Sequence, residues 1–368
     1  MYFKRKVNVR VTVLLALAVL MAGTIASSAT ATQRTSAKAQ NETVTLAVAV
    51  AIADPGQVFL FAPEGFGFFK QEGLKVNALF NAGGGAALQQ VSGGRADFGL
   101  SSPENLWNGI AAGMPIRGFA LVLTNSIYHL GVGVPVGSPI KSVSDLKGKK
   151  IGVSSFTSGS YPSAQAKIAA AGLNPKTDVT FVPIGTGGPA AQAIQSGQVA
   201  AAVTTETQWA QINALGVKVR FLPKSTNPVD DLPSDVLFAK AATLERYPGL
   251  AARFARAIMK GTVATLANPN KALDYYYKLY PEPANALTRE QNMAIMKARL
   301  EDMKLIPAQK GKWGYMPINL YIQVQKLGLQ YGTVKKEQDI YALFTNSLVK
   351  LIDKFDPKAV AKQAKAAK

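Results

Sequence analysis

Hydroxyl side chains end two apolar stretches at corresponding places in the chain. Ser101 and Ser102 follow the first stretch, and Thr204, Thr205 and Glu206 follow a similar stretch about 103 residues later. Hydroxyl groups both donate and accept hydrogen bonds, whereas a glutamate carboxylate only accepts them. These side chains could together bind a small polar ligand.

Glycine turns precede both hydroxyl groups and open short predicted helices. The first copy reads Gly83-Gly84-Gly85 and the second contains Gly187-Gly188. A helix start rich in glycine leaves backbone N–H groups exposed at the positive end of the helix dipole, which suits an anionic group. Two further helix starts of this kind are expected near 55–57 and 158–160. The candidate ligand-binding residues are therefore Gln57, Gly84, Gly85, Ser101, Ser102, Ser158, Gly159, Ser160, Tyr161, Gly187, Gly188, Thr204, Thr205 and Glu206.

Strands and helices alternate around these candidates and the pattern occurs twice. In the first copy the β-branched and apolar runs predict strands at 44–50, 74–80 and 116–123, besides the strand that ends at the first hydroxyl pair. Equivalent segments recur between 151 and 219. Such alternation predicts two α/β units, each with a mostly parallel sheet covered by helices on both faces.

Two connections link the units. The first spans 124–146 and includes a strand-like segment, 129–136; the second spans 223–234 and leads into a short strand. We therefore expect the chain to cross to a second lobe and return, which makes a two-strand hinge. The predicted lobe 1 comprises 43–130 with 235–368, and lobe 2 comprises 131–234. Ligands of open α/β sheets bind at the carboxyl ends of the strands, so the cleft between the lobes is the predicted site.

The chain beyond residue 250 is predicted to be helical. Apolar stripes at helical spacing include Leu250, Phe254 and Ile258, then a methionine stripe from 293 to 303 behind a Thr288–Gln291 capping box, and a third stripe from 340 to 355. Stripes of this kind usually pack into a core. They predict a helical C-terminal extension of lobe 1.

The N-terminus has the features of a cleaved signal peptide. Residues 1–10 carry four basic side chains, an apolar run follows, and small residues at 29–31 suit cleavage after Ala31. Loss of these four basic residues would reduce the net charge from +19 to +15. The chain contains no cysteine, which excludes a lipid anchor, disulfides and thiol catalysis. Export makes nucleic acid an unexpected partner, and the basic, alanine-rich C-terminal tail is interpreted as a solvated helix end.

Single residues of possible functional interest also have structural interpretations. His129, the only histidine, is expected to lie in an apolar strand with a structural or hinge role. Glu206 could face the cleft or the solvent; in the cleft it would favour a ligand with an amine or another donor. Trp107 and Trp209 are interpreted as core residues. Aromatic residues near helix starts could stack on a ligand, namely Phe59, Phe156 and Tyr161.

Five segments give the chain a recognisable resemblance. They are APEGFGFFKQEGLKV (62–76), GGRADFGLSS (93–102), SDLKGKKIGVSSFTSGSY (144–161), AAAGLNPKTDV (169–179) and QSGQVAAAV (195–203). The chain resembles the nitrate/sulfonate/taurine-type periplasmic substrate-binding proteins of ABC importers, a family that also includes binders of the thiamine pyrimidine precursor.

The resemblance implies a type II, double-crossover fold, a ligand in the cleft and delivery to a membrane permease. Ser101 and Ser102 stand where the first lobe of the family meets ligand, and 158–160 stand at the helix start of its second lobe. One departure is the second glycine turn, which is followed by Ala200-Ala201 where the first copy has Ala96-Asp97.

These observations together predict a monomeric, periplasmic solute-binding protein without a cofactor or bound metal. The expected ligand is a small organic anion, with sulfonate or carboxylate ahead of nitrate. The partners would be that ligand and an ABC permease in the inner membrane. Three alternatives remain: an enzyme on the same fold, a binding module that reports to a membrane sensor, and a binder of a pyrimidine-type cofactor precursor.

Overall fold

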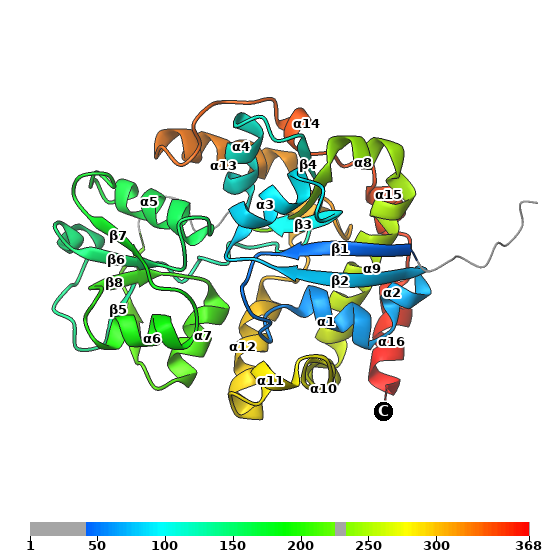
Figure 1. The fold of residues 1–368 in the computed structure, drawn as a ribbon, viewed down its shortest axis with the longest axis horizontal. Coiled ribbons are helices and arrows are strands. Elements are labelled where there is room, and N and C mark those ends of the chain that lie inside the picture. The colour runs from blue at the N-terminus through cyan, green and yellow to red at the C-terminus, as the bar shows by residue number, and fades with distance from the viewer. Residues whose placement is uncertain (1–41, 225–232, 368) are drawn as a thin grey trace, which may run out of the picture. The chain divides into compact units, whose positions relative to one another are not determined.

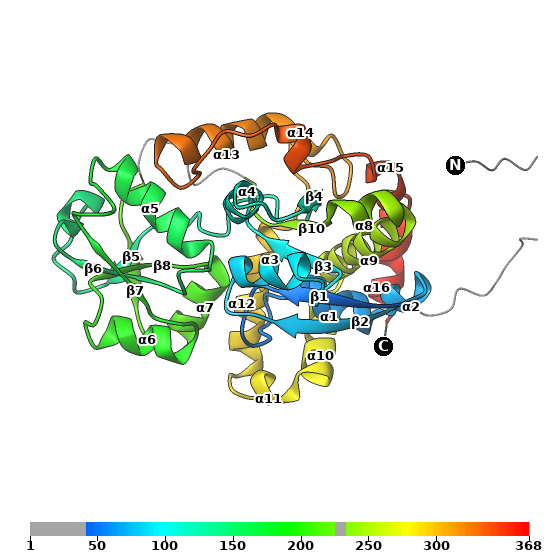
Figure 2. The same cartoon turned by 45° about the horizontal axis from the view of Figure 1, so that its top comes forward.

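The computed structural model describes residues 42–224 and 233–367, which form two five-stranded sheets flanked by helices (Figures 1 and 2). The predicted signal peptide, 1–31, and most of the predicted return loop lie outside the described residues. In the described ranges we find no helix with the length and apolar character needed to span a bilayer.

The first sheet has the strand order β2-β1-β3-β10-β4. Strand β1 runs parallel to β2 and β3, whereas β10 runs antiparallel to both β3 and β4. The strands are β1 (Glu42–Val48), β2 (Leu74–Phe80), β3 (Phe98–Ser101), β4 (Ile116–Leu121) and β10 (Val236–Lys240).

The second sheet has the corresponding order β7-β6-β8-β5-β9. Strand β6 runs parallel to β7 and β8, and β5 runs antiparallel to β8 and β9. The strands are β5 (Gly133–Pro135), β6 (Lys150–Val153), β7 (Thr180–Pro183), β8 (Ala201–Val203) and β9 (Val219–Phe221).

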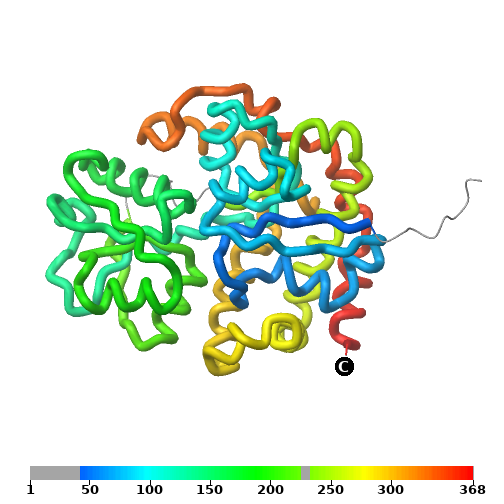
Figure 3. Tube along the Cα trace, viewed as in Figure 1, coloured from blue at the N-terminus to red at the C-terminus, as the bar shows by residue number. Residues whose placement is uncertain are grey.

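The antiparallel strand of each sheet comes directly after a crossing between the sheets. β5 is the first strand after the chain leaves the first sheet, and β10 is the first strand after it returns. The course of the chain through both parts can be followed in the tube of Figure 3. This exchange confirms the predicted double-crossover class. We call the part built on the first sheet lobe 1 and the part built on the second sheet lobe 2. For the residue limits of the two lobes we use those predicted from the sequence.

The sheet of lobe 1 is buried on both faces because its strands alternate between two apolar layers. Along β10, Leu237 belongs to the core beneath α1 and α9, while Val236 and Phe238 belong to the core beneath α3 and α4. Phe98 of β3 stacks on Phe254 of α9, with ring centroids 4.4 Å apart. The period of two in a β-strand thus supplies both helical layers with contacts.

Lobe 1 contains most of the helices, and the C-terminal ones cover both faces of its sheet. They are α1 (Val58–Gly65), α2 (Phe68–Gln71), α3 (Gly84–Ser92), α4 (Pro103–Ala111), α8 (Ala241–Arg246), α9 (Pro248–Ala267), α10 (Pro269–Leu279), α11 (Pro281–Ala284), α12 (Arg289–Glu301), α13 (Ile318–Gln330), α14 (Ile340–Leu343), α15 (Val349–Ile352) and α16 (Pro357–Ala366), with a 3-10 turn at Pro307–Gln309. Lobe 2 has α5 (Ser160–Ala170), α6 (Gly188–Gln195), α7 (Glu206–Ala214) and a 3-10 turn at Val143–Leu146.

Two of the three C-terminal stripes lie on helices as predicted. The first lies on α9, and the methionine stripe begins on α12, where Thr288 and Gln291 form the expected capping box. The third stripe does not form one helix. At Phe344 the backbone is extended, and Thr345 N–H donates to Gly118 O of β4, so the segment splits into α14 and α15.

His129 was expected in a strand, and this prediction is wrong. It lies in a turn before β5, where its backbone N–H donates to Ser126 O. The ring Nδ1 lies 2.8 Å from the same carbonyl oxygen. The apolar run that suggested a longer strand instead fills the crossing between the lobes, where Ile127 and Tyr128 are buried.

Candidate functional site

A cavity of about 150 Å³ lies between the lobes, at the carboxyl ends of the parallel strands. Lobe 1 contributes the segments that follow β1, β2 and β3, and lobe 2 contributes those that follow β6, β7 and β8. The two crossings add Ile127, Tyr128 and Asp235, and α12 adds Arg299. The cavity therefore lies where open α/β sheets bind ligands.

Half of the candidate residues line this cavity, namely Gln57, Gly84, Ser101, Ser102, Ser158, Gly159 and Thr205. Other candidates lie behind this lining. Gly85, Ser160 and Thr204 are engaged in the hydrogen bonds described below, and Tyr161 packs against Phe181 with ring centroids 5.3 Å apart. Gly187, Gly188 and Glu206 are also absent from the lining.

Glycine at 83 allows the two lobes to touch at one side of the cavity. Gly83 has φ 134°, and a Cβ there would lie 2.8 Å from the backbone nitrogen of Ser158 in lobe 2. Next to this contact Gly85 N–H donates to Thr157 O at 2.8 Å. A side chain at 83 would be strained and would also collide with the other lobe.

Hydroxyl groups of lobe 2 fix the shape of the wall opposite lobe 1. Ser160 Oγ accepts from Ser154 N–H at 3.0 Å and lies 2.7 Å from Ser158 Oγ. Ser154 Oγ lies 3.1 Å from Thr204 Oγ1. Ser160 and Thr204 therefore hold the lining residues Ser154 and Ser158 in place from behind.

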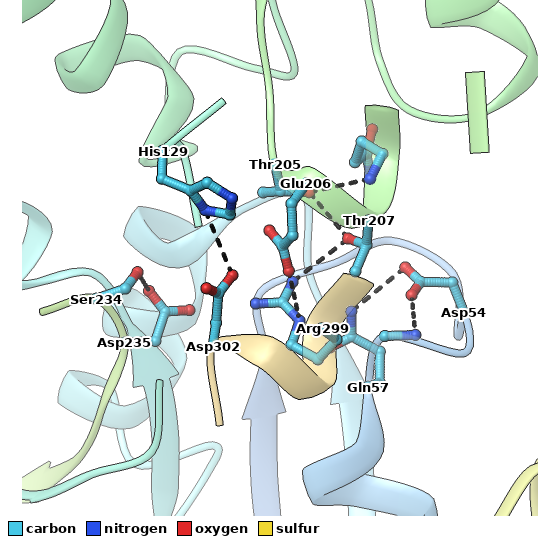
Figure 4. Close-up of polar contacts among 12 residues, drawn as sticks. Asp54, Gln57, His129, Thr205, Glu206, Thr207, Ser234, Asp235, Arg299 and Asp302 are labelled. Carbon is cyan, nitrogen blue, oxygen red and sulfur yellow. Dashed lines mark hydrogen bonds and ion pairs between the residues drawn. The ribbon is translucent and has the colours of Figure 1, made fainter. Parts of the chain in front are cut away.

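Glu206 lies neither in the open cleft nor in solvent but in an ion pair between the lobes. Its Oε1 lies 3.1 Å from Arg299 Nε, and the two side chains are 2% and 4% exposed (Figure 4). Arg299 Nη2 also donates to Thr207 Oγ1 at 3.4 Å. Near the far end of the same helix pair, Gln291 Nε2 donates to Ala214 O at 2.8 Å. Helix α12 of lobe 1 is thus tied to α7 of lobe 2.

Two more acidic side chains lie near the Glu206–Arg299 ion pair, and we call these four residues together with Asp54 the charged cluster. Asp302 follows α12, is 2% exposed and lies with its Oδ2 3.7 Å from His129 Nδ1. Asp235 ends the second crossing and accepts from Ser234 Oγ at 3.2 Å. Figure 4 shows both carboxyl groups on the side of Arg299 opposite Asp54.

Asp54 shapes the loop between β1 and α1. Its Oδ1 accepts from Gly56 N–H at 2.7 Å, and its Oδ2 accepts from Gln57 Nε2 at 3.3 Å. Both oxygens therefore hold the loop that presents Gln57 to the cavity. Asp54 itself also lines the cavity.

Burial raises the pKa of all four carboxyl groups around Arg299. Desolvation raises the pKa of Glu206 to about 8 and that of Asp235 to about 6, despite the nearby guanidinium. Desolvation likewise raises the pKa values of Asp54 and Asp302. Burial acts to lower the pKa of Arg299, but the four carboxyl groups together raise it. One cation is thus surrounded by more carboxyl groups than it can compensate.

The aromatic candidates divide between the core and the cavity. Trp107 is buried, and its Nε1–H donates to Gln325 Oε1 of α13 at 2.6 Å. Trp209 is buried against Phe221. Phe59 lines the cavity, whereas Phe156 is 53% exposed.

The most informative charged residues were not among the candidates. Arg299, Asp54 and Asp235 line the cavity. Asp54 stands in a loop whose neighbour Gln57 was selected, so proximity to a helix start could have indicated it. Asp235 directly precedes a predicted strand, but nothing in its local sequence distinguishes it from a solvated loop residue.

Comparisons with known proteins agree with this architecture. The model of the family described as NMT1/THI5 like matches residues 55–272. Riboflavin-binding protein RibY of Chloroflexus aurantiacus is 24% identical over 288 residues, which cover 77% of this chain and 79% of RibY. The 4-amino-5-hydroxymethyl-2-methylpyrimidine phosphate synthase of Uromyces fabae is 26% identical over 255 residues, which cover 64% of this chain and 71% of the synthase.

A solved structure extends the likeness to both lobes. The periplasmic aliphatic sulphonate binding protein SsuA of Escherichia coli superposes with a TM-score of 0.62 at 18% identity, covering 84% of this chain and all of SsuA. The chain therefore has the two-lobed fold of the periplasmic binding proteins, with its C-terminal helices as part of that fold.

Proposed function

The chain belongs to the NMT1/THI5-like family, and from this premise we propose that it is an exported solute-binding protein of an ABC importer. It would capture a small organic ligand between its lobes and deliver it, as a monomer, to a permease in the inner membrane. The observation that carries this proposal is the cavity of about 150 Å³ between the carboxyl ends of the strands of both lobes. Closure of two lobes around a ligand is a common binding motion.

The chemistry of the cavity wall favours binding over catalysis. The described lining residues include neither histidine nor lysine, and the whole chain lacks cysteine. Serine hydroxyls need an adjacent base to act as nucleophiles. Asp54 holds its own loop, and His129 is directed to Ser126 and Asp302 outside the lining. The likeness to a pyrimidine phosphate synthase keeps an enzyme as the alternative to be tested.

The size of the cavity favours a small ligand. An engineered cavity of about 150 Å³ in another protein accommodates benzene. With the lobes placed as they are here, a molecule of comparable size would fit, whereas a ligand as large as riboflavin would require the lobes to separate.

Two features support the organic anion expected from the sequence. The start of α3 at Gly84 and the hydroxyls of Ser101 and Ser102 meet at the cavity. Arg299 adds a guanidinium whose Nη1 is buried without a hydrogen-bond partner. A sulfonate or carboxylate oxygen would supply the acceptor that this donor lacks, and hydrogen bonds to charged groups contribute about 1.5–3 kcal/mol each.

A pyrimidine-type ligand is the second candidate. The carboxyl group of Asp235 at the cavity wall favours a ligand that donates hydrogen bonds, and Phe59 offers an aromatic surface. An aminopyrimidine has both properties.

A thermal-shift screen tests these proposals. The purified chain would be heated with sulfonates, carboxylates, nitrate, pyrimidines and, as controls, neutral sugars. A ligand at 100 times its Kd stabilises the folded state by about 2.7 kcal/mol, which is readily measured. Stabilisation by sulfonates or carboxylates would support the first ligand class, and stabilisation by pyrimidines alone the second. A response to sugars only would contradict both, and conversion of a bound ligand into product would favour the enzyme.

A further inference from the structure

An open groove of about 460 Å³ on the outer side of lobe 1 is lined mainly by basic side chains. They are Arg253, Arg256 and Lys260 of α9 and Lys354, which follows α15. Glu72 is the single acidic residue among the described residues that line the groove. Figures 1 and 2 show α15 and α16 at the end of lobe 1 that points away from lobe 2, so this groove is separate from the cavity between the lobes.

Glu72 holds the three basic side chains of α9 in place. Arg256 Nε and Nη2 donate to its carboxylate at 2.9 and 2.5 Å, and Lys260 Nζ donates to it at 2.6 Å. Arg253 Nη1 donates to the backbone oxygen of Glu72 at 2.7 Å. These basic side chains are only 15–28% exposed, so their positions are fixed before any partner arrives. One carboxylate cannot neutralise three cations, and the groove keeps an excess of positive charge.

A stripe of lysines continues from the groove along α16. This helix packs against α9, where Asn268 Nδ2 donates to Ala364 O at 3.0 Å. Val360 and Ala364 form the buried side of α16. The exposed side carries three lysines at helical spacing, namely Lys358, Lys362 and Lys365. We call these three lysines and the four basic residues of the groove the basic face.

The acidic side chains near α16 have other roles. Asp356 caps α16 by accepting from Lys358 N–H at 2.8 Å, and Asp353 accepts from Trp313 N–H at 3.0 Å. Within residues 42–224 and 233–367, the lysines at 354, 358, 362 and 365 form no ion pair. Their charges therefore remain available to an external anion.

An exposed leucine lies among these cations. Leu351 lines the groove and is 44% exposed, and its backbone oxygen accepts from Arg256 Nη1 at 2.6 Å. An anionic lipid surface suits both features, because its phosphates attract basic side chains and its acyl boundary accepts an apolar one. A nucleic acid would neutralise the cations but would leave the leucine in water.

We propose that the basic face binds the surface of a lipid bilayer that contains anionic lipids. Lipid phosphates would lie at the groove and along the lysines of α16, with Leu351 at the boundary between headgroups and acyl chains. Binding there would keep the protein at the membrane while lobe 2 stays free to move. The inference goes beyond the proposed function, because it does not depend on what the cavity between the lobes binds.

Vesicle co-sedimentation tests the inference, with the chain lacking its predicted signal peptide. Vesicles of equal parts phosphatidylglycerol and phosphatidylcholine should bind it at least tenfold more tightly than vesicles of phosphatidylcholine alone at about 50 mM salt. Binding should be lost at about 500 mM salt, because exposed charges are then screened. Equal binding to both kinds of vesicle would overturn the proposal, as would tighter binding to a DNA duplex than to the anionic vesicles.

Two triple variants with the same change in net charge locate the site. Each basic residue near an anionic surface contributes about fivefold in affinity, so loss of three should weaken binding about a hundredfold. The test variant combines Lys358→Gln, Lys362→Gln and Lys365→Gln. The control combines Lys141→Gln, Lys149→Gln and Lys176→Gln, which are exposed in lobe 2, and should bind within threefold of wild type. An equal loss in both variants would show that overall charge and not the basic face binds the vesicles, and would contradict the proposal.

A second pair of variants tests the apolar contact. Leu351→Ser should weaken binding to the anionic vesicles about fivefold, because it removes the side chain that enters the acyl boundary. Ile322→Ser is the matched control on α13, where Ile322 is 51% exposed and lies outside the groove, and should leave the affinity unchanged. An unchanged affinity in Leu351→Ser would overturn the placement of the leucine in the membrane.

Discussion

Replacement of Glu206 by glutamine should stabilise the protein at alkaline pH. Desolvation raises the pKa of Glu206 from 4.5 to about 8. A carboxyl group whose pKa is raised by folding contributes most stability below its unfolded pKa and loses that contribution as the pH rises to its folded pKa. The difference corresponds to at most about 5 kcal/mol between pH 4.5 and 8. Desolvation raises the pKa of Asp235, to about 6, so it changes stability in the same direction.

The glutamine variant removes this dependence because it keeps the size of the side chain without its charge. At pH 5, where Glu206 is protonated, the variant should match the wild type to within about 1 kcal/mol. At pH 8.5 it should be more stable by up to about 5 kcal/mol. Arg299→Met should behave in the opposite way. It leaves the carboxyl groups without their cation and should cost about 3–5 kcal/mol at pH 8.5, with a smaller loss at pH 5.

Urea unfolding of the ligand-free protein at pH 5, 6.5 and 8.5 measures both effects. Burial acts to raise the pKa of Glu72, but hydrogen bonds from Arg256 and Lys260 lower it overall. Glu72 therefore loses its contribution to folding stability only in acid. The pH series stays at or above 5 to keep this effect out of the measurement. The reasoning would be refuted if wild-type stability rose from pH 5 to 8.5. It would equally fail if Glu206→Gln were as destabilising as Arg299→Met at pH 8.5.

Three further predictions concern other contacts in the protein. Gly83→Ala should weaken binding of the best ligand from the thermal-shift screen at least tenfold in isothermal titration, since its Cβ would meet lobe 2. The control Gly148→Ala also has a positive φ, 75°, but open space around it, and should leave the affinity unchanged. Glu72→Gln should cost about 1–3 kcal/mol in urea unfolding at pH 7, because it loses ionic hydrogen bonds from α9, and should not alter ligand affinity. Thr205→Ala should cost about 1 kcal/mol, because Thr205 Oγ1 caps α7, and Thr205→Ser should recover most of that stability.

Local sequence was sufficient to predict much of the fold. The strand at 74–80 has the predicted bounds, and the strand predicted at 116–123 begins at its predicted residue and ends two residues early. The repeat also placed the glycine turns and the hydroxyls at the carboxyl ends of strands in both lobes. These features depend on residues close together in the chain, where periodicity and turn chemistry decide the conformation.

Features that depend on distant partners were not predicted. The apolar residues from 340 to 355 have helical spacing, yet Phe344 is extended because it lies against Gly118 of β4. A Cβ at 118 would be 2.5 Å from that ring, so the two positions fit only as a pair. Helical periodicity alone cannot reveal such a competing tertiary contact.

The charged cluster shows where sequence reasoning could have gone further. On α12 and just beyond it, a second stripe contains Asn292, Ile295, Arg299 and Asp302, all at most 3% exposed. These positions recur at helical spacing beside the methionine stripe, so the sequence places a charge on an inward face. A buried arginine requires an acidic partner, which would have marked α12 as a helix that meets acidic groups. The identity of that partner could not follow, because Glu206 lies in the other lobe and only the double crossover brings it to α12. Local motifs thus supply the hydroxyl and glycine residues that line the cavity, whereas the placement of Arg299 beside Glu206 depends on how the two lobes meet.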